Sequence, residues 1–490
     1  MFSCIVRQPV WCALCLPLLL YGCKVMGPDY KAPVLSETDV PAQWTSPANA
    51  GEHQVPAARW WTELSDPVLD RLVDQAFLGS PTLEAAMARL SESRAYHVQA
   101  DAAGRPDVSS GAGTQRTGQT RDATPGGYSW LSLSSSWELD LFGAVSRGKE
   151  GATAREEAKL ATLGDARVSL AADVADAYLS YRACQSQLAL REKDTESRDA
   201  TRKLTEESVE AGFTAPYESI RSTASVAEAK TRLASTRAEC QQLENLITRL
   251  TGIPRPVLAT MLLDRPIGLD RLPEPRHFDV AIPAQAVMQR PDVRAAERAL
   301  AAASADIGLA EADRYPRVSL NGSFGYSTTT SSSSGSVSLG SWSFGPSISL
   351  PIFDGGRRVA AVQAAQARYD EALAAYRARA RSAIQDVENA LTRYAAANDR
   401  AENARIAASQ YQQYFDAVES RYREGASNLL ALEDARRVML DARQTLLGVQ
   451  KERLQAWITL NRVTGGGAQY VPESPQMQQA VAARPASANP

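Results

Sequence analysis

The sequence predicts a mainly α-helical protein with a smaller β-sheet part, built from two copies of one unit. Each copy would hold a helix, two strands and a long helical hairpin. Three observations predict this fold: a helix-periodic stretch from Gly356 to Gly465, its repetition at a constant offset in the first half, and a serine-rich alternating segment before each hairpin.

The stretch from Gly356 to Gly465 contains no proline, and apolar or alanine residues return every three or four positions. It is interrupted at 424–428, which reads Glu-Gly-Ala-Ser-Asn. The part before this break, 357–423, would be roughly 100 Å long at ~1.5 Å per residue. Because so long a helix normally packs along a partner of similar length, we predict an antiparallel hairpin with its tip at Gly425.

The same hairpin is predicted a second time in the first half of the chain. A shift of 213 positions matches Gly143 with Gly356, Val174 with Val387, Tyr181 with Tyr394, and Gly212 with Gly425. Upstream the shift becomes 210, as for Pro81 and Pro291. So long a period indicates a domain duplication, and unrelated alanine-rich helices are the alternative.

Composition argues against nucleic-acid binding and catalysis. The 490 residues carry a net charge of −3 with the two signs well mixed. The three histidines, His53, His97 and His277, lie far apart without the spacing of metal ligands. There is neither a glycine-rich phosphate loop nor a nucleophile elbow. We therefore expect no enzyme, no cofactor, no metal site and no nucleic-acid partner.

The first residues, 1–22, are predicted to be a signal peptide, with Arg7 ahead of a short apolar core. Leu20-Tyr21-Gly22-Cys23 resembles the bacterial lipobox, which makes Cys23 the expected lipid-attachment site. Tyr21 stands where that motif has a small residue, so an ordinary signal peptide is the alternative. Lys24 follows Cys23 where an aspartate would suggest retention in the inner membrane, so the resemblance to a lipobox implies outer-membrane sorting. No other long apolar run follows, so any membrane crossing would use β-strands.

Two cysteines of the first hairpin are expected to face each other. Cys184 and Cys240 each lie 28 residues from Gly212, which places them at equal height in an antiparallel hairpin. Both also fall on the apolar seam of their helix. A disulfide is one outcome in an oxidising compartment, and two small buried thiols are the other.

The segment before the first repeat, 23–58, is rich in proline, alanine and serine and is predicted to be a lipidated, extended arm. Trp60 and Trp61 follow and are interpreted as packing anchors. Asp66 ahead of Pro67 is typical of a helix start, and Ser80 ahead of Pro81 opens the next helix.

Residues 107–142 change to a strand pattern. From Leu131 to Leu141, large apolar residues occupy the odd positions except Ser135, and serine or acidic residues occupy the even ones, which predicts a strand with one apolar face. Val108–Gln119 is the weaker partner strand, and 122–127 is the loop between them.

The second copy repeats the pattern over 317–352. Val318–Tyr326 alternates, Thr328–Gly335 is a loop, and Val337–Leu350 returns. The apolar positions change parity between Leu339 and Trp342, which predicts a β-bulge.

Each strand is long enough for a tilted membrane strand, which needs ~9–11 residues. A soluble sheet packed on the helices is the alternative. Four strands are too few to close a membrane barrel, for which about eight is the lower limit, so a spanning sheet would have to be shared between copies.

The domain plan follows from these elements. The first repeat is expected at 59–252 with its hairpin at 144–251, and the second at 291–465 with its hairpin at 356–464. A proline-rich equatorial connector, 253–290, would join them. The tail, 466–490, is expected to be disordered.

Several short motifs, in order along the chain, resemble the outer-membrane efflux factors, which are TolC-like channel-tunnels, and especially their lipoprotein branch serving multidrug efflux pumps. The motifs are Cys23 with Gly27-Pro28-Asp29-Tyr30, Arg59-Trp60-Trp61, Trp137-Glu138-Leu139-Asp140-Leu141-Phe142-Gly143, Arg290-Pro291-Asp292-Val293, Tyr315-Pro316 and Pro351-Ile352-Phe353-Asp354-Gly355-Gly356.

The resemblance implies a homotrimer with a twelve-stranded outer-membrane β-barrel continued by a periplasmic α-barrel. It also implies a periplasmic adaptor and an inner-membrane pump, of the resistance-nodulation-division type, as partners. The implied function is a passive conduit for drugs or other small toxic compounds. A channel for type I protein secretion and a helical lipoprotein scaffold without a pore are the rival interpretations.

The resemblance also assigns site residues. Asp434 and Arg437 match the family's Leu-Asp-Ala-x-Arg motif and would form a periplasmic gate, with Glu433 replacing an apolar residue. Ala431 occupies the position of a second gate aspartate of TolC. An exposed surface ion pair is the alternative reading of Asp434 and Arg437. The expected adaptor-docking tips, for which plain turns are the alternative, are Gly212, Phe213, Gly425, Ala426 and Ser427.

Overall fold

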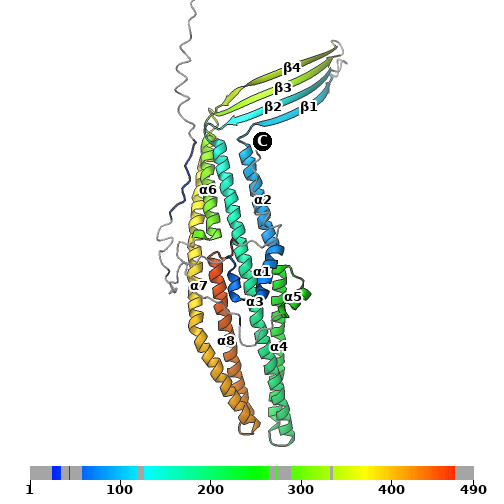
Figure 1. Cartoon of the computed structure of the whole chain (residues 1–490), viewed down its shortest axis with the longest axis vertical. Helices are drawn as coiled ribbons and strands as arrows, with labels where there is room; N and C mark the ends of the chain where they lie inside the picture. Colours follow the sequence, from blue (N-terminus) through cyan, green and yellow to red (C-terminus); the bar gives the residue numbers. More distant parts are fainter. Residues whose placement is uncertain are drawn as a thin grey trace, which may run out of the picture.

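The computed structural model describes residues 25–34, 44, 58–118, 126–263, 272, 288–331 and 335–469. The predicted signal peptide, Cys23, most of the arm and connector, and the tail from 470 lie outside the described residues. The molecule is elongated, with a sheet at one end and long helices running away from it to two tips (Figure 1).

Eight α-helices and a short 3-10 helix are described, and most of their length lies in two hairpins. They are η3 (Trp60–Leu64), α1 (Pro67–Gly79), α2 (Pro81–Ala102), α3 (Ala144–Glu210), α4 (Pro216–Thr251), α5 (Arg255–Leu263), α6 (Pro291–Ala312), α7 (Arg357–Arg423) and α8 (Leu429–Val463). The two longest, α3 and α7, both have 67 residues.

Four strands complete the fold: β1 (Asp107–Thr117), β2 (Gly126–Leu139), β3 (Arg317–Ser331) and β4 (Gly335–Ser349). The order helix, two strands and hairpin therefore occurs twice, as α2-β1-β2-α3-α4 and α6-β3-β4-α7-α8. The predicted duplicated, mainly helical fold is confirmed.

The sheet is antiparallel throughout, in the order β1-β2-β3-β4, so that the two copies meet where β2 pairs with β3. The register between β3 and β4 is continuous from the pair Arg317 and Ser349 to the pair Ser331 and Gly335. The predicted bulge between Leu339 and Trp342 is therefore wrong. The change of parity instead moves the apolar side chains to the other face of a regular strand.

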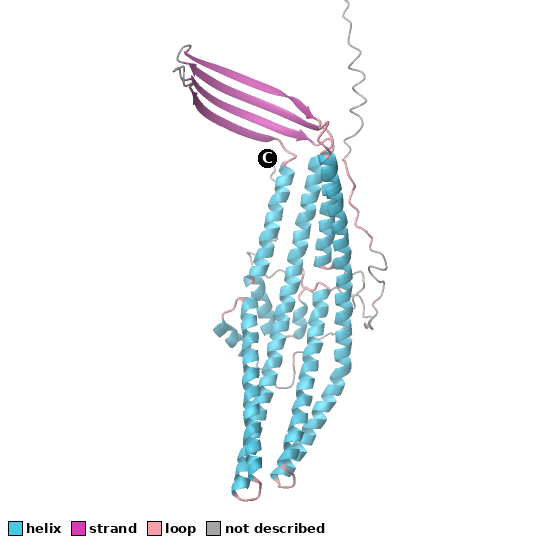
Figure 2. Cartoon of the chain, turned by 180° about the vertical axis from the view of Figure 1, so that it is seen from behind, coloured by secondary structure: helices cyan, strands magenta, loops and turns pink. Residues whose placement is uncertain are grey.

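Within the described residues no other layer covers the sheet, which projects away from the helices in Figure 2. The apolar side chains Trp342, Phe344 and Ile348 alternate along β4 on one face and are 71–80% exposed. The described part of the chain therefore leaves one apolar face of β4 exposed.

The main core lies at mid-height, around Trp60 and Trp61, which are both buried. The Trp60 ring meets Trp457 of α8 edge-on, with centroids 5.4 Å apart, and Trp61 stacks on Phe77 of α1. Asp66 caps α1 by accepting from the backbone N–H of Val68. The aromatic anchor thus joins η3, α1 and α8.

At each junction between a strand and a long helix, an aspartate side chain accepts hydrogen bonds from backbone N–H groups at the start of the helix. Asp140 accepts from the backbone N–H groups of Val145 and Ser146 at the start of α3. Asp354 accepts from those of Gly356 and Arg358 at the start of α7. A carboxylate at a helix N-terminus satisfies free amides and the helix dipole, so both hairpins are fixed to the sheet in the same way.

Candidate functional site

The two hairpin tips lie together at the end of the molecule opposite the sheet (Figure 2). Gly212 and Gly425 both have φ of 76°, a left-handed conformation that favours glycine. At the first tip the Phe213 N–H donates to Ser208 O at 2.9 Å, and at the second the Ala426 N–H donates to Arg421 O at 2.8 Å. The two turns are therefore built alike.

The surfaces of the two tips differ. At the first tip Phe213 is 86%, Tyr217 65% and Ile220 73% exposed. At the second tip Ala426 is exposed and Ser427 is half-buried. Large apolar side chains in full contact with water are typical of an interaction surface, so the first tip is the better candidate for binding a partner.

The predicted gate residues lie on the first turns of α8. Asp434 Oδ1 is 3.2 Å from Arg437 Nη2, and the two side chains are 54% and 68% exposed. They share one helix face, as their spacing of three requires. Within one chain they form a surface ion pair, so any role in a gate depends on other copies of the chain.

A buried charged cluster beside this pair was not predicted from the sequence. Glu433 accepts from Arg198 of α3 at 2.6 Å and also pairs with Arg436, whose side chain is 1% exposed. The sequence did contain an indication of this buried cluster. Arg436 follows Leu429 and Leu432 at helical spacing, so a charged residue falls on the apolar face of α8.

The beginning of the described chain is bound at the other end of the molecule, next to the sheet. The Met26 N–H donates to Phe142 O at 3.1 Å. The buried Arg147 side chain donates to the carbonyls of Met26 and Gly27, at 3.0 and 3.2 Å, and to Asp29 at 2.8 Å. Residues of the predicted arm are therefore held against the start of α3.

The same segment also contacts α6. The Tyr30 hydroxyl donates to Glu297 at 2.5 Å, and Glu297 pairs with Arg298. Burial, followed by the hydrogen bond to Glu297, raises the pKa of Tyr30 well above its usual range. Tyr30 thus stays protonated and able to donate this bond.

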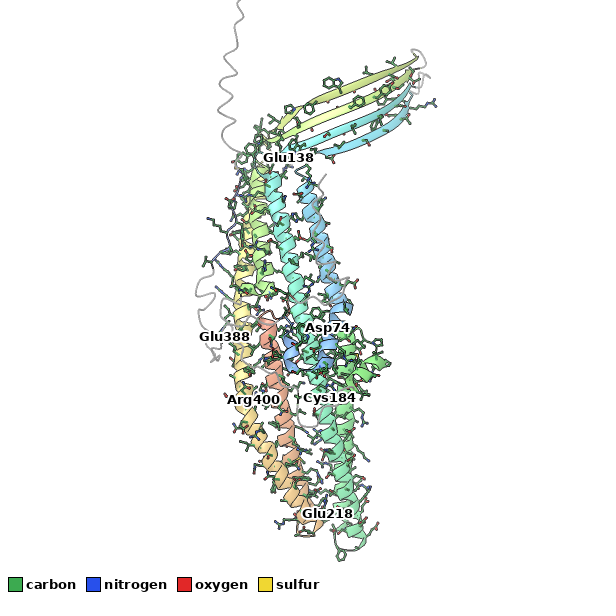
Figure 3. The ribbon with its side chains drawn as sticks, in the orientation of Figure 1. Asp74, Glu138, Cys184, Glu218, Glu388 and Arg400 are labelled. Carbon is green, nitrogen blue, oxygen red and sulfur yellow. A yellow bond between two sulfur atoms is a disulfide. The ribbon has the colours of Figure 1, made fainter. Side chains whose placement is uncertain are left out.

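Cys184 of α3 and Cys240 of α4 face each other, as the equal spacing from Gly212 predicts. The structure joins them by a disulfide, with their Cα atoms 5.6 Å apart. Figure 3 labels Cys184 in the first hairpin, and both cysteines belong to the same buried cluster as Trp60 and Trp61. The bridge would keep α3 and α4 in register where they enter the core.

The described part of the chain contains no group of three or more His, Cys, Asp or Glu side chains arranged to hold a metal ion. None of the helices in that part is both long enough and apolar enough to cross a membrane.

A duplicated unit of long helices ending in a bare antiparallel sheet defines the class of outer-membrane channel proteins. A model of the family described as "Outer membrane efflux protein" matches residues 72–253 and 282–466. The chain therefore belongs to the outer membrane efflux protein family. This is a family of channels, which confirms the prediction that the chain is not an enzyme.

Individual relatives agree with this assignment. The chain is 31% identical to "Nodulation protein T" of Rhizobium leguminosarum bv. trifolii, over 92% of this chain and 96% of that protein. It is 29% identical to "Antibiotic efflux pump outer membrane protein ArpC" of Pseudomonas putida, over 92% and 93%. Among solved structures, the outer-membrane channel OprN matches 91% of this chain and 100% of its own, at 31% identity and a TM-score of 0.81.

Proposed function

We propose that three copies of this chain form the outer-membrane channel of a tripartite efflux pump. The channel is a passive conduit that carries drugs or other small toxic compounds from an inner-membrane pump and a periplasmic adaptor to the outside. The observation that carries the proposal is the bare sheet at one end of two long helical hairpins. Export of antibiotics by the pump of one relative supports this class of cargo.

The sheet supports insertion into a membrane. Its strands have 11 to 15 residues, and a tilted membrane β-strand needs ~9–11. Trp342, Phe344 and Ile348 would be unfavourable in water but suit a lipid-facing surface. Serines on the opposite face, such as Ser323 and Ser343, suit a polar lumen.

The free edges of the sheet support a trimer. Within the described sheet, β1 and β4 each have one unpaired side, and unsatisfied backbone groups are not tolerated in lipid. Pairing β4 of one copy with β1 of the next removes both edges. Three copies of four strands give a closed ring of twelve, within the range of membrane barrels.

The bound arm supports lipid attachment at Cys23. Val25 packs against Gly143, at the junction of the sheet and α3. Since Cys23 precedes Val25 by two residues, acyl chains on Cys23 would enter the membrane beside the base of the sheet. The spanning sheet and the acyl chains would then anchor the channel side by side in the same membrane.

The tips support contact with an adaptor and closure of the channel. Phe213, Gly212 and the turn of Gly425, Ala426 and Ser427 form the ends that a periplasmic adaptor would bind. Asp434 and Arg437 from three copies, meeting near the trimer axis, would form a charged ring that closes the conduit and selects ions.

Reconstitution tests this function most directly. Purified full-length protein is placed in planar bilayers while its oligomer size is measured in the same preparation. A trimer with stable single-channel current is the expected result. A trimer without current would instead favour a periplasmic scaffold, and a monomer with no current would reject the channel altogether.

A further inference from the structure

At the end of the sheet farthest from the helices, the apolar side chains change faces. β2 leads into α3 and β4 into α7, so the first residues of both strands lie at this end (Figure 1). Side chains two positions apart point to the same face of a strand. Two apolar residues at the start of β2 therefore share a face with Ser132, and two at the start of β4 share a face with Ser341. We call these four side chains the mouth collar: Tyr128, Trp130, Val337 and Leu339.

The mouth collar crosses both copies of the repeat. Ser327 of β3 is paired with both Trp130 and Leu339, and the next row away from the helices has the same arrangement around Thr329. Directly paired residues of an antiparallel sheet lie on the same face. No side chain in these two rows of the described sheet is charged. The collar is therefore an uncharged surface of apolar groups and hydroxyls.

The opposite face of the sheet changes at the same height. One row of paired residues across the four strands carries only hydroxyl side chains: Thr114, Ser129, Thr328 and Ser338. Hydrogen bonds of 3.0 and 2.9 Å join them in two pairs. Because a row of hydroxyls does not suit contact with lipid chains, the lipid-facing band ends before this row. The collar therefore lies at the outer end of the conduit.

Trp130 lies flat on β1. A Cβ atom on Gly111 would come within 2.8 Å of Cη2 and Cζ3 of the indole, and one on Gly113 within 2.7 Å of its Nε1. The two glycines thus contact opposite ends of the ring and leave the room that it occupies. Trp130 is still 38% exposed, so one face of the ring rests on the strand and the other is open. A ring that lies along the wall lines a conduit and does not block it.

We propose that the mouth collar binds uncharged aromatic compounds as they leave the conduit, with the Trp130 indole as the stacking platform. The proposal rests on the proposed channel function and deepens it by naming a class of cargo. In the proposed trimer the sheets join at their edges, so the serine-bearing face stays toward the lumen and no second copy covers the collar. The molecules that reach it are water, ions and cargo.

The chemistry of the collar selects among these molecules. An aromatic ring stacks on the open indole face and removes apolar area of both partners from water. Hydrated ions gain no partner, because the two rows hold no charge. Ser132 Oγ lies 3.4 Å from the Gly111 position that the ring also contacts, so its hydroxyl can bond a polar group at the edge of the cargo. The collar is open to the lumen, which suits a conduit that must also release what it binds.

The first experiment measures binding as block of the current through single channels in planar bilayers. Indole is the uncharged aromatic probe, and glucose is the uncharged probe without an aromatic ring. We expect the indole concentration that halves the mean current to rise about twofold to tenfold in Trp130→Ser, as the loss of one aromatic contact implies. Trp130→Phe should keep most of the effect. Tyr326→Ser is the matched control, because Tyr326 lies at nearly the same height on the opposite face.

The second experiment needs no current. The thiol introduced by Ser132→Cys lies beside the ring, and its reaction rates with N-phenylmaleimide and N-ethylmaleimide are compared in purified full-length protein, with the modified position located by peptide mass analysis. Stacking of the phenyl ring on Trp130 should favour the aromatic reagent. The ratio of the two rates should fall about twofold to tenfold when Trp130→Ser is added, and should stay unchanged when Tyr326→Ser is added.

Three outcomes would overturn the proposal. If Trp130→Ser changes the responses to indole and glucose equally, the ring only narrows the conduit. If the ratio of reaction rates does not depend on Trp130, the ring is not a stacking platform. If the thiol at position 132 reacts with neither reagent, another part of the chain covers the ring. Failure of the proposed function is distinguishable: wild-type protein would then carry no current, while the rate ratio would still decide whether Trp130 binds aromatic compounds.

Discussion

Gly27 lies so close to Gly308 of α6 that a Cβ atom on Gly27 would come within 2.3 Å of the Gly308 Cα. Backbone therefore meets backbone, and φ of 83° at Gly27 independently favours glycine. The contact lets the arm lie flat on α6, where Arg147 can reach its carbonyls. Two glycines 281 positions apart thus help to determine where residues 25–34 are bound.

Gly308→Ala should release the arm. A Cβ at 308 would lie 2.8 Å from Cδ and Nε of Arg147, which must then move and lose its bonds to Met26 and Gly27. We expect faster hydrogen exchange at the Met26 amide, which now donates to Phe142 O. Gly448→Ala in α8 is the control, because its Cβ would meet open space. Unchanged exchange at Met26 would show that the glycine contact does not hold the arm.

The start of α6 should contribute a pH-dependent part of stability. Burial raises the pKa of Asp292, but hydrogen bonds from Arg290, at 2.9 and 3.0 Å, outweigh it and hold the pKa below its ordinary value of 3.8. A depressed carboxyl pKa stabilises the fold above the ordinary value, and the contribution is lost as pH falls through the depressed value.

Asp292→Asn should therefore lower the free energy of unfolding at pH 7 by about 1.5–3 kcal/mol, the range for hydrogen bonds to charged groups. The difference from wild type should shrink below pH 3.8. Denaturant unfolding followed by helical circular dichroism, between pH 7 and pH 3, measures both. Asp370→Asn, at an exposed position of α7, is the control. A difference that stays constant with pH would contradict the assignment to Asp292.

Local patterns explain why so much of the fold could be predicted. The 67 residues of α7 follow from helical periodicity without proline, and its end follows from Gly425. The alternation of leucine and serine predicted β2 for the same reason. The β-bulge predicted between Leu339 and Trp342 was wrong. A strand whose surroundings differ along its length can change its apolar face without changing its hydrogen bonding.

Contacts between distant segments could not be predicted. Glu433 and Arg198 are 235 positions apart and meet only because α8 lies along α3. The binding of Gly27 to α6 depends likewise on folded geometry. Cys184 and Cys240 were the exception, since hairpin symmetry about Gly212 converts a sequence distance into a spatial one.

The disulfide should stabilise the first hairpin. It closes a segment with a sequence separation of 56, and a bridge over such a loop is worth roughly 2–4 kcal/mol. Cys184→Ser/Cys240→Ser should lower the thermal midpoint of the helices, and reduction of the wild type should have the same effect. The double serine variant should be insensitive to reductant, which is the internal control. Two free thiols in a non-reducing peptide digest of the wild type would reject the bridge.

The gate proposal predicts that Asp434→Ala/Arg437→Ala raises single-channel conductance and antibiotic influx. Stability should hardly change, because an exposed ion pair contributes ~0–1 kcal/mol. Arg400→Ala/Glu452→Ala is the matched control: that pair is also exposed, at 2.7 Å, but lies farther from the tip.

A ring of three aspartates also predicts ion selectivity, which a plain surface pair does not. Asp434→Asn should reduce the preference for cations, measured as a shift of the reversal potential toward zero in a salt gradient. If conductance, influx and reversal potential all match those of the wild type, Asp434 and Arg437 face solvent away from the axis, and the closure of the channel must be sought elsewhere along α8. If only the reversal potential shifts, Asp434 lines the conduit without closing it.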